Sequence, residues 1–246
     1  MVFSDTTNKN GILQMCEFYT NLGDAAITGN TTLKARFAQL VNSRYHTVVT
    51  KILKSQDDWD FDDSNHADFP IMTTPLVASQ RDYGIPVSEK VLKIKRVDIT
   101  YDGTNWNRVL PLDSSEIEDG LGNDANIDAN FDKSMPRYDL QYNSIWVYPL
   151  ATSSEVAAGA QMRLEWTREI DEFVVGDTTQ EPGIDEPFHI LLPIGASLDW
   201  AIAKRLPLKS DLKVLWDEKI KELEEYYHHK DIDRKYHFRF RLKNMN

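Results

Sequence analysis

The chain has 246 residues, of which 41 % are apolar, and it carries a formal net charge of −11. Its length and apolar content suffice for one large domain or two small ones with an ample core, and they exclude a wholly disordered chain. The acidic balance excludes a general nucleic-acid-binding protein, because affinity for phosphate needs clustered cations.

Two helices are predicted within residues 1–56, the first part of a helical module. In residues 10–22 and again in residues 30–53, apolar side chains recur at steps of three and four. Thr31 or Thr32 is the expected N-cap of the second helix. Cys16 lies among apolar neighbours, so we expect a buried thiol rather than a nucleophile.

The single cysteine excludes an internal disulfide and a four-cysteine zinc site. The chain also has no run of about eighteen apolar residues and no signal-peptide layout at its start. We therefore expect a protein made in a reducing cytoplasm, with no membrane span.

An acidic junction follows at residues 57–68, within the sequence "DDWDFDDSNHADF". A calcium EF-hand loop would need glycine and glutamate where Asp63 and Phe69 stand, so that interpretation fails. We predict that Trp59 and Phe61 are buried anchors between aspartates that face water. A looser divalent-cation site stays open as an alternative.

Residues 69–176 predict an inserted β domain. Apolar and polar side chains alternate in residues 91–112, 137–150 and 161–173. The pairs Asp102-Gly103 and Asn143-Ser144 are the expected hairpin turns of the first two segments. Several short strands with turn residues between them indicate an antiparallel sandwich or small barrel.

Two details of this β domain bear on function. Met162, Leu164 and Trp166 should face one side of the last strand. Residues 113–136 are acidic and rich in Gly and Asn, which predicts a long exposed loop, and loops of that length are usually functional or mobile.

Residues 185–230 predict the helices that complete the helical module. Asp185 is the expected N-cap, and Pro193 marks either the true first turn or a kink. Residues 210–230 form a second helix with one apolar face. The predicted fold class is α+β: a helical bundle interrupted by an inserted antiparallel β domain, followed by an extended arm.

Motifs of catalysis are not found in the sequence. It has no G-x-S-x-G turn and no glycine-rich phosphate loop, and Ser197 lies inside a helical pattern. Adjacent helical residues point about 100° apart, so His228 and His229 cannot share a metal ion. We expect no enzymatic activity, no cofactor and no metal.

The C-terminal arm, residues 231–246, carries the clearest binding signal. From Lys230 onward six Lys or Arg stand against two Asp, a net charge of +4, so the remainder carries −15. Apolar and basic side chains alternate with period two, which indicates an amphipathic strand. It is either an edge strand or frayed end of the chain itself, or an arm that pairs with a neighbouring chain by strand addition. The candidate partner-binding residues are Arg234, Lys235, Tyr236, His237, Phe238, Arg239, Phe240, Arg241, Leu242 and Lys243.

The order of these features resembles the head-to-tail adaptor (connector, or head-completion) proteins of tailed bacteriophages. The resemblance begins at "WDFDDSNHADFPIMTTPLVASQRDYGIP" and "LKIKRVDITYDGTNWNRVLPLD", with a Q-x-D-Y-x-I-P step and an I-x-R-V strand. It continues through "YNSIWVYP", "DTTQEPGIDEPFH" and "IKELEEYYHHKD", and so covers nearly the whole chain. Each motif alone is weakly specific for the family, whereas their fixed order along the chain is moderately specific.

The resemblance implies a structural virion protein at the head–tail junction, made in the host bacterial cytoplasm. Such proteins form a ring, commonly twelve-fold, beneath the portal protein. The ring seals the packaged capsid and continues the DNA channel, and it is a platform for a tail tube or nozzle protein. Genomic DNA would pass without sequence-specific binding, and the C-terminal arm would dock on the portal.

Two alternatives stay open. One is a tail-tube or gatekeeper component lower in the same assembly. The other is a carbohydrate-binding module, because the β region holds Trp106, Trp146 and Trp166 and the loop 113–136.

Overall fold

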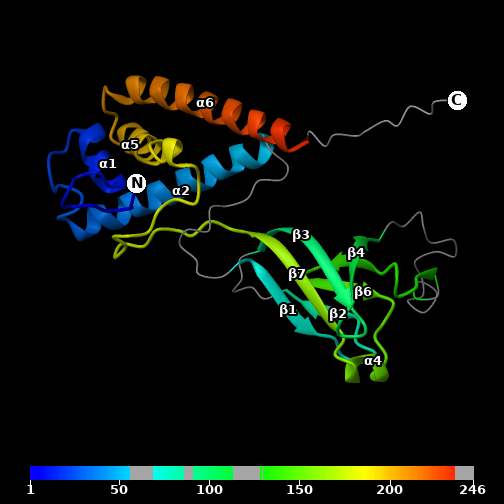
Figure 1. Cartoon of the computed structure of the whole chain (residues 1–246). Helices are drawn as coiled ribbons and strands as arrows, with labels where there is room; N and C mark the ends of the chain where they lie inside the picture. Colours follow the sequence, from blue (N-terminus) through cyan, green and yellow to red (C-terminus); the bar gives the residue numbers. More distant parts are fainter. Residues whose placement is uncertain (56–68, 86–90, 113–127, 129, 236–246) are drawn as a thin grey trace, which may run out of the picture. The chain divides into compact units, whose positions relative to one another are not determined.

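The computed structural model describes residues 1–55, 69–85, 91–112, 128 and 130–235, and for 230–235 the backbone alone (Figure 1). It divides into two compact units. One comprises Met1–Ala67 with Ile170–Asn246, and the other comprises Asp68–Glu169. Helices dominate the first unit and strands the second, which confirms the α+β class. None of the described helices is long and apolar enough to cross a bilayer.

The first unit is built around one apolar helix. Its elements are α1 (Ile12–Thr20), α2 (Thr31–Ser55), the 3-10 turn η3 (Glu186–Phe188), α5 (Leu191–Ala203) and α6 (Lys209–Lys235). Ten of the thirteen residues of α5 are buried, and α5 contacts α1, α2 and α6. A helix that is apolar on all sides belongs at the centre of its unit. Gly195 permits close packing there, because a Cβ would lie 2.5 Å from the ring of Trp216 on α6.

Several helix ends differ from the sequence prediction. The Oδ1 atom of Asn30 accepts the N–H of Leu33 at 3.1 Å, so Asn30 caps α2 and the predicted caps Thr31 and Thr32 are wrong. Asp185 is the N-cap residue of η3, as predicted, although its side chain makes no capping hydrogen bond. Pro193 lies in the first turn of α5, one of its two predicted roles, where its missing N–H costs nothing.

The α6 helix runs to Lys235, so residues 231–235 of the predicted extended arm are helical instead. Helical periodicity in the sequence fades before this point, but a helix can continue through polar residues when they face water. The predicted arm beyond Lys235 lies outside the described residues.

The second unit is one curled seven-stranded sheet in the order β1-β7-β3-β4-β5-β6-β2. The strands are β1 (Ile71–Pro75), β2 (Asp82–Gly84), β3 (Val91–Thr100), β4 (Trp106–Pro111), β5 (Arg137–Gln141), β6 (Ser144–Tyr148) and β7 (Gln161–Arg168). All pairs are antiparallel except β4 with β5. The prediction of a wholly antiparallel domain is therefore wrong at this pair. A parallel pair needs a long connection, and the chain between Pro111 and Arg137 supplies one.

The inner face of the sheet forms the core of this unit. Met162, Leu164 and Trp166 are each 1–2 % exposed, which confirms that they share a face. They pack with Val97 and Ile99 of β3 and with inward side chains of the other strands. Alternation along each strand thus places one row of apolar side chains inside the curl.

The first predicted hairpin turn is confirmed and the second is displaced by one residue. Between β3 and β4, the Asp102 carboxylate accepts the N–H groups of Thr104 at 2.8 Å and Asn105 at 2.7 Å. Gly103 follows with φ +73°, a conformation that glycine adopts without strain. Between β5 and β6 the two loop residues are Tyr142 and Asn143, because Gln141 pairs with Ser144.

Candidate interaction surfaces

Most of the predicted site residues lie outside the described residues. Trp59 and Phe61 of the acidic junction lie outside the described residues. Arg234 and Lys235 belong to the last turn of α6. The rest of the arm also lies outside the described residues: Tyr236, His237, Phe238, Arg239, Phe240, Arg241, Leu242 and Lys243.

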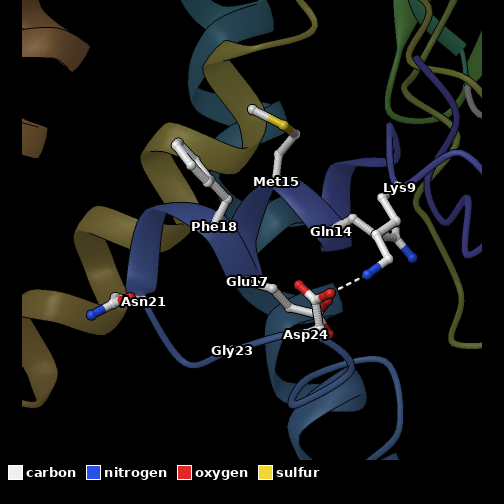
Figure 2. A pocket seen from close by; sticks show the side chains of 8 residues that line it. All are labelled: Lys9, Gln14, Met15, Glu17, Phe18, Asn21, Gly23 and Asp24. Atoms are coloured by element: carbon white, nitrogen blue, oxygen red, sulfur yellow. Dashed lines mark hydrogen bonds and ion pairs between the residues drawn. The ribbon is translucent and has the colours of Figure 1, made fainter.

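An exposed apolar surface lies on α1, which the sequence prediction missed. Phe18 is 73 % exposed and Leu22 38 %, although both are large and apolar. In Figure 2, Met15 and Phe18 project from the same side of α1 beside a cavity of about 380 Å³. An exposed apolar cluster next to a hollow is typical of a surface that contacts another protein. We call Met15 and Phe18, which line this cavity, the α1 surface.

A buried carboxylate holds the loop behind the α1 surface. Glu17 is 6 % exposed, and its carboxylate accepts the N–H groups of Ala25 at 3.2 Å, Ile27 at 2.9 Å and Thr28 at 2.8 Å. The Thr28 hydroxyl donates at 2.9 Å to Oε1, the carboxylate oxygen that also accepts the N–H groups of Ile27 and Thr28. Because these bonds join α1 to the loop that precedes α2, the frame beneath Phe18 is fixed by its own hydrogen bonds.

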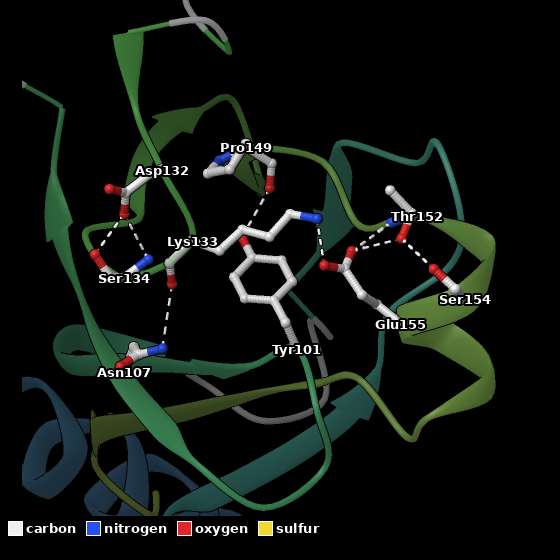
Figure 3. A network of polar contacts seen from close by, with 9 residues as sticks. All are labelled: Tyr101, Asn107, Asp132, Lys133, Ser134, Pro149, Thr152, Ser154 and Glu155. Carbon is white, nitrogen blue, oxygen red and sulfur yellow. Dashed lines mark hydrogen bonds and ion pairs between the residues drawn. The ribbon is translucent and has the colours of Figure 1, made fainter.

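A polar network closes one end of the sheet (Figure 3). Lys133 forms an ion pair with Glu155 and lies 5.4 Å from the centre of the Tyr101 ring. The Tyr101 hydroxyl donates to the carbonyl of Pro149 at 2.8 Å, and burial raises the pKa of this phenol. Glu155 also accepts the N–H and the hydroxyl of Thr152, and so caps the short helix α4 (Ser153–Ala157). These bonds fix the end of the long β4–β5 connection against the sheet.

The outer face of the sheet carries an arginine cluster. The Asp98 carboxylate, 3 % exposed, accepts from Arg96 at 2.7 Å and from Arg163 at 2.8 Å. The Arg163 guanidinium lies 4.7 Å from the centre of the Trp106 ring and covers it. Trp166 is 2 % exposed in the core, so of the three tryptophans named for sugar binding this one does not offer its ring to a ligand.

A third surface lies between the two edges of the curled sheet. Side chains of β1, β2, β6 and β7 line one cavity of about 250 Å³. The lining residues are Met72, Thr74, Gln80, Tyr83, Gly84, Ile85, Ile145, Met162 and Leu164. We call this cavity and the facing edges of β1 and β2 the seam. No described strand pairs with the outer edges of β1 and β2, and such edges beside apolar side chains can bind an added strand.

Two side chains with nucleophilic chemistry are enclosed in the helical unit. Burial raises the pKa of the Cys16 thiol to about 12, which confirms the predicted buried thiol. Ser197 is 0 % exposed, within α5. Across the described parts of the chain, no group of three or more His, Cys, Asp or Glu could hold a metal ion.

No protein-family model matches the chain, and a search of curated proteins found no match.

Proposed function

We propose that the chain is a structural virion protein, the head-to-tail adaptor of a tailed bacteriophage. In this proposal copies of the chain form a ring under the portal, seal the packaged capsid, continue the DNA channel and provide the attachment platform for the tail. The order of motifs along the chain suggests the family. The helical bundle and the C-terminal arm beyond Lys235 are parts of the same proposal.

One observation supports this proposal most directly: each unit carries a surface suited to contact with another protein. On the helical unit, the α1 surface exposes Phe18 beside a cavity. On the β unit, the seam leaves two strand edges facing one cavity. A subunit of a ring must bind a neighbour on each side and partners above and below, so several separate contact surfaces are expected.

The charge distribution agrees with a DNA channel. The whole chain carries −11, and the part before Lys230 carries −15. Carboxylates along a channel repel the phosphates of DNA and so favour sliding over adhesion. The proposal therefore places acidic side chains in the lumen; a lumen lined by Lys and Arg would contradict this element of it.

The test is sedimentation velocity and negative-stain imaging of the purified chain, alone and with the portal protein of the same virus. The expected result is a ring on the portal. The variant Phe18→Asp should weaken assembly, whereas Phe18→Leu, which keeps an apolar side chain there, should not. If the chain does not bind the portal but binds a tail protein, the result would instead support the tail-tube or gatekeeper alternative. A chain that binds neither contradicts the adaptor function.

A further inference from the structure

The seam is where the curled sheet remains open among the described strands. The strands β1 and β2 stand at opposite ends of the strand order, yet their side chains line the same cavity. Residues 76–81 join the two strands directly, and the N–H of Val77 donates to the hydroxyl of Tyr83 at 3.0 Å. The two edges therefore face each other and are tied together at one end.

The register of β1 shows which backbone groups face the seam. The N–H of Trp166 donates to the carbonyl of Pro70, and the N–H of Leu76 donates to the carbonyl of Ala160. In an antiparallel pair, alternate residues bond to the partner strand, so the even-numbered residues of β1 bond to β7. The N–H and carbonyl of Thr73 therefore point away from β7, towards the seam.

The same reasoning applies to β2. The N–H of Val147 donates to the carbonyl of Arg81, and the N–H of Ile85 donates to the carbonyl of Asn143. Odd-numbered residues of β2 thus bond to β6, and Gly84 presents its N–H and carbonyl to the seam. Among the described residues, Thr73 and Gly84 thus each turn an N–H and a carbonyl towards an incoming strand, and buried backbone groups of this kind need partners.

The side chains at the seam specify what kind of strand fits. Apolar groups of Met72, Ile145 and Leu164 line the cavity beside the polar side chains of Thr74 and Gln80, so the inward side chains of the incoming strand should be mainly apolar. On the outer face, Asp82 of the edge strand β2 is exposed, so its carboxylate favours arginine or lysine at the neighbouring outward positions of an incoming strand.

Residues 236–243 have this pattern. Their sequence, "YHFRFRLK", alternates aromatic or aliphatic side chains with histidine, arginine or lysine. The segment carries Arg239, Arg241 and Lys243 and no acidic residue, whereas residues 68–169 hold sixteen Asp or Glu and ten Lys or Arg. The apolar side chains of this segment thus match the inside of the seam, and its basic side chains match the acidic outer face.

We propose that residues 236–243 of one copy insert as a β-strand into the seam of a neighbouring copy. The inserted strand bonds to Thr73 on β1 and Gly84 on β2, and it closes the curled sheet. This inference rests on the proposed function. A second copy is chosen as the partner because a ring needs a contact that repeats from one subunit to the next. The arm would then link subunits of the ring rather than dock on the portal.

The experiment mixes two full-length variants. Phe238→Asp combined with Phe240→Asp removes two apolar side chains of the arm and leaves the seam intact. Thr73→Pro removes the seam-facing N–H while keeping the β1–β7 bonds, because that N–H does not point to β7. Asp82→Lys is a second seam variant in case the proline impairs folding. The controls are Phe238→Leu with Phe240→Leu in the arm and Thr73→Val in the seam.

The expected result in sedimentation velocity is that arm and seam variants do not associate alone but form a complex when mixed. A peptide of residues 236–246 added to the arm variant should slow amide hydrogen exchange of Thr73 and Gly84 by about tenfold or more, and leave Tyr83, already bonded to β6, unchanged. Unchanged exchange at Thr73 and Gly84 overturns the proposal. Slowed exchange without complex formation in the mixture overturns the assignment to a second copy. Portal binding is measured separately: if it persists while the seam result is negative, the adaptor function stands without this inference.

Discussion

Removing the carboxylate of Glu17 should destabilise the helical unit strongly, because this buried carboxylate accepts hydrogen bonds from several backbone groups. The carboxylate accepts three backbone N–H groups, of Ala25, Ile27 and Thr28, and one hydroxyl. In Glu17→Ala all four donors lose their acceptor. The bond to Ile27 is buried, whereas the backbone bonds to Ala25 and Thr28 are part-buried.

The magnitude follows from this difference in burial. A buried donor left without a partner costs about 1–3 kcal/mol, and donors that water can reach cost less. One buried and two part-buried N–H groups therefore give a loss of about 3 kcal/mol in the free energy of unfolding. For a unit of this size, that loss corresponds to a fall of about 6–12 °C in the unfolding midpoint.

The assay is thermal and urea unfolding followed by circular dichroism at the helix band. Glu218→Ala is the matched control, because Glu218 is an exposed glutamate on α6 of the same unit; it should change stability by less than about 0.5 kcal/mol. If Glu17→Ala is no more destabilising than this control, the hydrogen bonds of Glu17 do not hold the loop and the reasoning is refuted.

Three further predictions use single substitutions. Arg44→Ala should cost about 2–3 kcal/mol in urea unfolding, because the guanidinium donates to both oxygens of the Asp199 carboxylate across α2 and α5; a loss below about 1 kcal/mol would contradict this. Trp166→Phe should change the unfolding free energy by less than about 1 kcal/mol, because the lost volume is offset by removal of an indole N–H that is buried without a partner among the described residues. Asp102→Asn should destabilise the β unit at pH 7 and lose its effect in acid. Hydrogen bonds, of which that from the Asn105 N–H has the largest effect, lower the pKa of Asp102. The ionised carboxylate therefore stabilises the folded state fully above the ordinary pKa of 3.8, and this stabilisation is lost as the pH falls through the lowered pKa. A difference between wild type and Asp102→Asn that stays constant down to low pH would contradict this assignment.

The sequence predicted those elements whose side chains carry a strong period. Residues 31–55 and 91–100 form the expected helix and strand, because one apolar face must be buried whatever lies opposite it. The buried thiol of Cys16 and the inward row at Met162, Leu164 and Trp166 followed from the same reasoning. Helix caps were less predictable, since Asn30, Thr31 and Thr32 all have side chains that can cap and only the backbone path selects one.

The surfaces depended on tertiary structure. Phe18 lies one position from the apolar stripe of residues 10–22, and sequence alone does not tell whether a neighbouring element covers it. The parallel pairing of β4 with β5 depends on where a long connection returns. The seam depends on the sheet curling until β1 and β2 line one cavity.

By itself the sequence determined the α+β class and the alternating basic segment at 236–243, because local periodicity and charge are properties of neighbouring residues. Only the tertiary structure decided that β1 and β2, with the outward backbone groups of Thr73 and Gly84, border one cavity, because these strands meet through the curl of the whole sheet and not through any local pattern.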